Sequence, residues 1–90
     1  MWEDGMIALN GGKYGYSAKV YDLGSSYGID GGRISKLYVF EDKTDREIVT
    51  YDREWILPKH RPKDGTEAGD VLAAILKMFP DRAKERQNHE

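Results

Sequence analysis

The chain has 90 residues, no cysteine and a net charge of −2, so it forms one small domain and carries no disulfide or thiolate metal site. Its 14 basic and 16 acidic side chains are interspersed, which argues against a dedicated nucleic-acid binder. No apolar run is long enough for a membrane span or an export signal, and we therefore expect a cytoplasmic protein. With only His60 and His89, we expect no histidine metal site and no cofactor.

The first half of the chain predicts a hairpin followed by a loop. Residues 6–9 form a short strand, and Asn10-Gly11-Gly12 is a turn signal because asparagine and glycine tolerate positive φ. Residues 14–21 alternate apolar and polar side chains, which is typical of a half-buried strand. Residues 22–32 hold four glycines, and Tyr27 and Ile29 within them favour an ordered loop over a disordered one.

The second half predicts two more strands and a helix. Residues 33–41 have apolar side chains on both faces, which indicates a central strand, and residues 47–51 form the answering strand. Residues 52–57 either extend it or bend away before Pro58. A helix follows, capped by Thr66 or by Asp70; the cost of Gly69 in a first turn favours Asp70, and Pro80 breaks or kinks the helix.

The predicted fold is α+β: a four-stranded antiparallel β-meander packed against one C-terminal α-helix. It spans residues 1–80, and residues 81–90 form a charged tail, either a solvated helical extension or a frayed end. The helix covers only one face of the sheet, because it is the only apolar stripe that remains. Since residues 34–41 are apolar on both faces, either the sheet curls on itself or a second copy packs there, so a homodimer is possible.

One segment resembles a known family. The string Tyr27-Gly28-Ile29-Asp30-Gly31-Gly32-Arg33-Ile34-Ser35-Lys36-Leu37, with Lys19-Val20-Tyr21-Asp22 before it and Tyr51-Asp52-Arg53 and Trp55 after it, is similar to small uncharacterised proteins of Gram-positive bacteria and their phages or prophages. The resemblance covers roughly residues 14–57, and Glu54 departs from the glycine that often follows the Tyr-Asp-Arg trio. It implies a phage or prophage context in a bacterial cytoplasm. It implies no activity and no site residues.

The glycine-rich segment is the first candidate site. Glycines can turn several N–H groups toward one point and an adjacent arginine adds a cationic fork, so Tyr27, Gly31, Gly32 and Arg33 are candidates for binding a phosphate or carboxylate. A strand follows instead of a helix, so this is neither a dinucleotide fingerprint nor a Walker loop. The alternative is a tight connection in which Arg33 pairs with a nearby acid such as Asp30.

Two further groups of residues are candidates for macromolecular contacts. Tyr51, Arg53 and Trp55 combine aromatic and cationic groups, as protein hot spots do, although they could equally close the edge of the core. Lys59, Arg61 and Lys63 form a short basic loop, which is either a solvated connector or a contact for nucleic acid.

Three functions follow in order of preference. The first is a non-catalytic protein-interaction module that binds and blocks a host or phage protein, such as an inhibitor of a host system. The second is a protein that binds or sequesters a nucleotide or other small anion, and the third is a nucleic-acid accessory protein. No spacing of acids, histidines or hydroxyls indicates a catalytic site, so we do not expect an enzyme.

Overall fold

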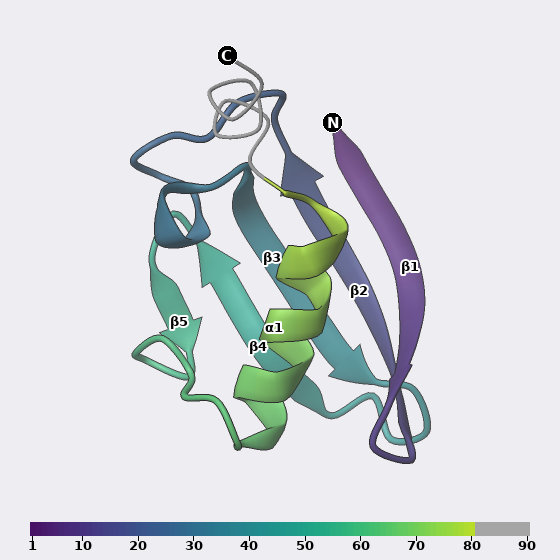
Figure 1. The fold of residues 1–90 in the computed structure, drawn as a ribbon. Helices are drawn as coiled ribbons and strands as arrows, with labels where there is room; N and C mark the ends of the chain where they lie inside the picture. The colour runs from purple at the N-terminus through teal and green to yellow at the C-terminus, as the bar shows by residue number, and fades with distance from the viewer. Residues whose placement is uncertain (81–90) are drawn as a thin grey trace.

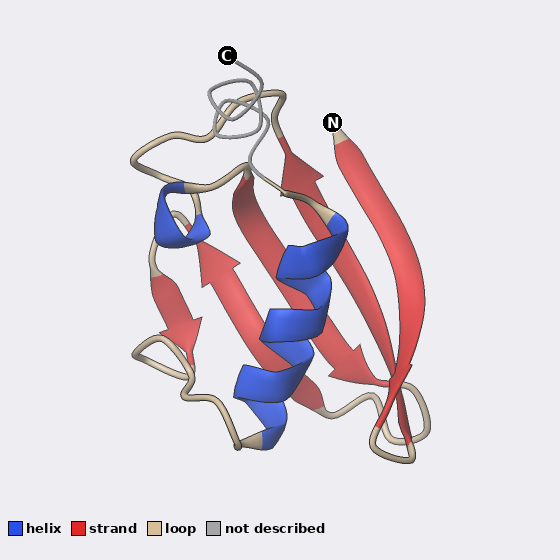
Figure 2. Ribbon diagram, viewed as in Figure 1, coloured by secondary structure: helices blue, strands red, loops and turns tan. Residues whose placement is uncertain are grey.

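The computed structural model describes residues 1–80 as one antiparallel sheet with a helix across one of its faces (Figures 1 and 2). The strands lie in chain order, β1-β2-β3-β4-β5, as a continuous meander. The element bounds are β1 (Trp2–Leu9), β2 (Gly12–Val20), β3 (Ile34–Glu41), β4 (Glu47–Asp52), β5 (Trp55–Leu57), the 3-10 turn η1 (Ile29–Gly31) and α1 (Glu67–Met78). The predicted tail, residues 81–90, lies outside the described residues.

The sheet has five strands, so the prediction of four was wrong. Asp52 is the last residue of β4, and residues 53–57 bend back, so that Trp55 of β5 pairs with Tyr51 of β4. The reversal requires Arg53 to adopt a left-handed backbone with φ of 63°. Glycine or asparagine normally occupies such a position. Because neither is present here, the turn could not be predicted from the sequence. The first strand is also longer than predicted and begins at Trp2.

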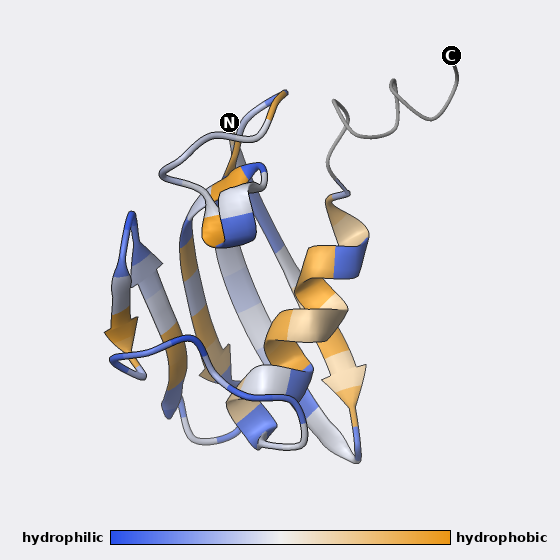
Figure 3. Cartoon of the chain, turned by 60° about the vertical axis from the view of Figure 1, so that its left-hand side comes forward, coloured by the Kyte–Doolittle hydropathy of each residue, from blue (hydrophilic) through white to orange (hydrophobic). Residues whose placement is uncertain are grey.

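One face of the sheet packs against α1 and η1 to form the core. Val71, Leu72 and Ile75 of the helix are at most 1% exposed, and they meet the inward side chains of β2, β3 and β4. Ile29 of η1 is equally buried in the same cluster, so the segment between β2 and β3 is anchored, as its apolar residue predicted. Figure 3 shows hydrophobic residues recurring along α1, which lies across the sheet.

The helix begins after Thr66, not after Asp70. The Thr66 hydroxyl accepts a hydrogen bond from the Gly69 N–H at 3.1 Å, while the Asp70 carboxylate accepts one from the Gly65 N–H at 2.9 Å. Gly69 is present because a Cβ there would lie 1.8 Å from the carbonyl oxygen of Lys63. Glycine lowers helix propensity at this position, but it allows the backbone of the helix to approach Lys63 closely. This contact could not be predicted from the sequence.

The opposite face of the sheet is left open by the described residues. Trp2, Met6 and Phe40 on this face are 48%, 50% and 39% exposed, and the Trp2 ring stacks on Tyr38 with centroids 6.1 Å apart. The prediction that β3 is central and apolar on both sides is confirmed, but the sheet does not curl over its outer face. Within residues 1–80, no helix has the length and apolar character that a bilayer crossing needs.

Candidate ligand-binding cleft

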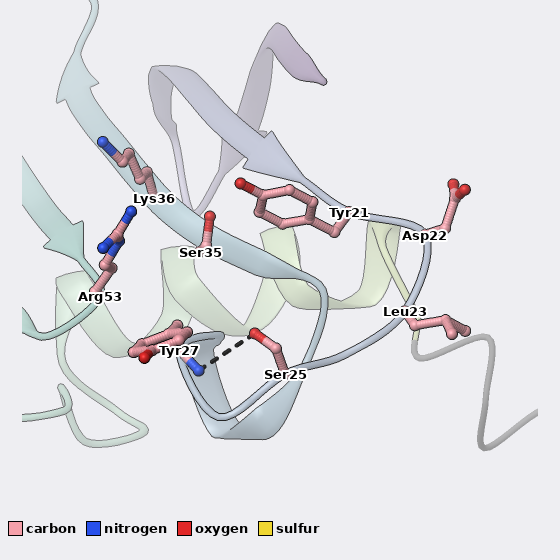
Figure 4. A pocket seen from close by; sticks show the side chains of 8 residues that line it. All are labelled: Tyr21, Asp22, Leu23, Ser25, Tyr27, Ser35, Lys36 and Arg53. Carbon is pink, nitrogen blue, oxygen red and sulfur yellow. Dashed lines mark hydrogen bonds between the residues drawn. The ribbon is translucent and has the colours of Figure 1, made fainter.

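A cleft opens where the segment between β2 and β3 passes the turn between β4 and β5 (Figure 4). Its volume is about 560 Å³. The walls come from three places in the chain: the exit of β2 with the following loop, the start of β3, and the turn after β4. Its lining residues are Tyr21, Asp22, Leu23, Ser25, Tyr27, Ser35, Lys36 and Arg53.

Glycines let the two arms of the loop touch backbone to backbone. A Cβ on Gly24 would lie 2.3 Å from the carbonyl oxygen of Gly31, and one on Gly28 would lie 1.9 Å from that of Gly32. The N–H groups of Gly31 and Gly32 donate to the carbonyls of Gly28 and Ile29, at 3.0 and 2.9 Å. These donors are thus used within the loop and do not face the cleft as an anion-binding nest.

Three side chains from distant parts of the chain hold the loop in place. Arg33 donates through Nε to the Tyr21 carbonyl at 2.8 Å and through Nη1 to the Pro80 carbonyl at 3.0 Å. Arg61 grips Asp30 with two hydrogen bonds of 2.8 Å, and the Tyr51 hydroxyl donates to the Tyr27 carbonyl at 2.9 Å. The hydrogen bond from Arg61, followed by its charge, keeps the pKa of Asp30 below its ordinary value despite partial burial.

A β-bulge brings a hydroxyl into the cleft. Lys19 pairs with Lys36 and Val20 with Ile34, so Ser35 is the extra residue on β3. Its carbonyl accepts a hydrogen bond from the Arg53 N–H at 3.0 Å, which fixes the turn after β4 beside the bulge. Bulges commonly redirect a side chain near a functional site. Here the bulge sets Ser35 between Tyr21 and Lys36 (Figure 4).

Two exposed phenol rings stand on opposite sides of the cleft. Tyr21 is 46% and Tyr27 is 60% exposed, although the backbone of both residues is hydrogen-bonded. The guanidinium carbon of Arg53 lies 5.6 Å from the Tyr27 ring centroid, and Lys19 Nζ lies 5.7 Å from that of Tyr21. Both distances fall within the range of cation–π attraction.

Positive charge gathers at one end of the cleft. Lys36 pairs with Asp52 at 3.6 Å, whereas Arg53 forms no ion pair within residues 1–80. The pKa of the Tyr21 phenol is lowered, first by its hydrogen bond with Lys19 and then by the charge of Lys19, with smaller effects from Ser35 and Arg53. The main cause of this shift, Lys19, lies beside the cleft and does not line it.

The structure divides the residues predicted from the sequence. Tyr27 and Arg53 line the cleft together, while Gly31, Gly32 and Arg33 shape the loop behind it without facing it. Tyr51 is buried, and its ring meets Trp55 edge to face at 4.8 Å between centroids, so both lie at the edge of the core. Lys59 and Lys63 are exposed and away from the cleft, and Arg61 is engaged by Asp30.

Sequence reasoning did not identify Asp22, Leu23, Ser25, Ser35 and Lys36 as cleft residues, whereas Tyr21 was one of the tyrosines considered for a nucleotide pocket. The alternation along β2 continues to Tyr21 and places it on the same side of the chain as Lys19. Their approach to β3 depends on the bulge at Ser35, for which the sequence has no marker. Among residues 1–80, no three or more acidic or histidine side chains gather where a metal ion could bind.

A family model described as a domain of unknown function, DUF7678, matches residues 1–80, and the chain belongs to this family. No curated protein and no solved structure matches the sequence. The matched region coincides with the described sheet, helix and cleft, so these features form the domain of the family in this chain.

Proposed function

We propose that this member of the DUF7678 family is a non-catalytic binding protein that holds a small anionic ligand in the cleft. The observation that carries the proposal is that Arg53 and Lys36 both line a cleft whose walls also include Tyr21 and Ser35. Hydrogen bonds from cationic donors to an anion are about twice as strong as neutral ones, and arginine can present two donors to one phosphate or carboxylate.

Two features of Arg53 support a binding role. Its side chain has no carboxylate partner within residues 1–80, so the guanidinium remains available to a ligand. Its backbone has φ of 63°, a conformation that costs non-glycine residues about 1 kcal/mol or more. Glycine would fit this turn at lower cost, so the presence of arginine in this chain supports a use for its side chain.

The test is a thermal-shift panel of phosphate, pyrophosphate, citrate, mononucleotides and cyclic dinucleotides. We expect at least one anion to raise the Tm of the wild type and to have less effect on Arg53→Gln. Lys59→Gln is the matched control, because it removes one positive charge from an exposed position outside the cleft. A flat response across the panel, or equal losses in the two variants, would refute an anion site at Arg53.

The open sheet face favours a second function, a protein-interaction module. Trp2, Met6 and Phe40 form an exposed apolar surface next to Tyr38, and aromatic residues and methionine are enriched in protein interfaces. The partner is a second copy of the chain or a host protein, and the phage or prophage context and the bacterial cytoplasm implied by the resemblance belong to this proposal.

Light scattering after size-exclusion chromatography distinguishes the two partners. If a second copy binds the open face, the wild type should run as a dimer and Phe40→Ser as a monomer with unchanged secondary structure. A wild type that stays monomeric at high concentration would rule out the homodimer. A dimer that persists in Phe40→Ser would place its interface elsewhere on the molecule.

A further inference from the structure

We infer that the ligand of the cleft carries an aromatic ring as well as an anionic group, and that it is a mononucleotide. This inference rests on the proposed function and makes it more specific. Its basis is the presence of two exposed tyrosine rings in the same cleft as Lys36 and Arg53, together with a volume larger than that of a bare anion.

The volume of the cleft, about 560 Å³, is larger than a simple inorganic anion needs. It lies within the ~300–1,000 Å³ that small-molecule sites occupy. A phosphate group bound to Lys36 and Arg53 would leave most of this space to water, whereas a nucleotide would occupy much of it.

Aromatic and cationic side chains share the lining of the cleft. Lys36 and Arg53 lie on one side, with Tyr27 beside Arg53, while Asp22 and Leu23 lie at the opposite end (Figure 4). Tyr21 lies across the cleft from Tyr27. A molecule that combines an anionic group with a planar ring matches this lining.

The two tyrosines are positioned for stacking before any ligand binds. The Tyr21 N–H and carbonyl both bond to Arg33, and the Tyr27 carbonyl accepts from Tyr51 while its N–H donates to the Ser25 hydroxyl at 3.2 Å. Their backbones are thus fixed while about half of each residue stays exposed. Fixed aromatic rings bind bases at little cost in conformational entropy.

The arginine beside Tyr27 extends the stacking surface toward the anion. Its guanidinium carbon lies 5.6 Å from the Tyr27 ring centroid, so the guanidinium and the phenol form adjoining surfaces. Arginine can stack on a planar ring and bind a phosphate through the edge of its fork. Arg53 is therefore placed to contact both the ring and the anionic group of one ligand.

The experiment compares ligands that differ only in the base. Isothermal titration measures AMP, GMP, CMP and UMP against ribose 5-phosphate, which keeps the sugar and the phosphate. We expect at least one nucleotide to bind about 5-fold to 150-fold more tightly than ribose 5-phosphate, which corresponds to one base–aromatic stack. Tyr27→Ser should remove most of that difference, whereas Tyr27→Phe should keep it because the ring remains.

The outcomes separate this inference from the proposed function. If ribose 5-phosphate binds as tightly as all four nucleotides, the aromatic part is wrong and the anion site stands. The ring contact at Tyr27 is also wrong if Tyr27→Ser retains the full preference. If neither the nucleotides, nor ribose 5-phosphate, nor any anion of the thermal-shift panel binds, both the inference and the proposed function fail. Circular dichroism of Tyr27→Ser checks that its fold is intact.

Discussion

Gly69→Ala sets helix propensity against backbone packing, and the structure decides the sign. Alanine stabilises an exposed helix position by up to about 1 kcal/mol relative to glycine. At Gly69, however, the new Cβ would lie 1.8 Å from the Lys63 carbonyl oxygen and 2.4 Å from its carbon. Because the obstacle is backbone and not the end of a flexible side chain, the start of the helix must move.

The movement also disturbs the helix cap. The Lys63 carbonyl accepts from the Thr66 hydroxyl at 2.6 Å, and that hydroxyl accepts from the Gly69 N–H. Overpacking costs about 1–3 kcal/mol and loss of a cap about 0.5–2 kcal/mol. After the gain in propensity is subtracted, we expect a loss of about 0.5–4 kcal/mol, which lowers the Tm by roughly 2 °C or more in a domain of this size.

Urea denaturation followed by circular dichroism measures this loss. Thr66→Val serves as the companion variant, since it removes the cap without adding an atom next to Lys63. We expect Gly69→Ala to be at least as destabilising as Thr66→Val. A Gly69→Ala protein more stable than the wild type would show that the Lys63 carbonyl does not approach the helix as described.

Three other variants test the pH response and the loop. Hydrogen bonds from Tyr14 first and Arg46 second keep the pKa of Glu67 below its ordinary 4.5. Its stabilisation is therefore present above that value and lost as the pH falls through the lower folded pKa, and acid melting curves of Glu67→Gln should depend less on pH than those of the wild type. Tyr51→Phe should cost about 1 kcal/mol in urea denaturation and weaken anion binding, because it releases the Tyr27 carbonyl. Gly28→Ala should abolish anion binding in calorimetry, since its Cβ would lie 1.9 Å from the Gly32 carbonyl oxygen.

The sequence correctly predicted the first hairpin turn and the helix, because both depend on residues that are close together in the chain. Asn10 and Gly11 take φ of 51° and 82°, as the turn signal required, and Leu9 pairs with Gly12 across it. The helix stripe was predicted from spacing, and Val71 and Ile75 are buried where the spacing placed them. In both cases the outcome depends on residues close together in the chain.

The missed features depend instead on contacts between distant residues. The fifth strand follows from an arginine in a left-handed turn, stabilised by a hydrogen bond from Arg53 to the carbonyl of Ser35. The cleft follows from the bulge at that same serine, which shifts the pairing of β2 with β3. Neither the fifth strand nor the cleft can be derived from propensity or periodicity, because both depend on contacts among β2, β3 and the turn after β4.

The sequence indicated the glycine-rich loop as a candidate for binding an anion directly. In the structure, its donors form hydrogen bonds within the chain, and the loop supports two residues of the neighbouring cleft. Its N–H groups bond within the loop, and its arginine, Arg33, braces the chain against Tyr21 and Pro80. Arg61 and Tyr51 hold it from the other side. A simple connection between two strands would not need so many distant contacts. They keep Tyr21 and Tyr27 in fixed, exposed positions, which is the preorganisation that a stacking ligand requires.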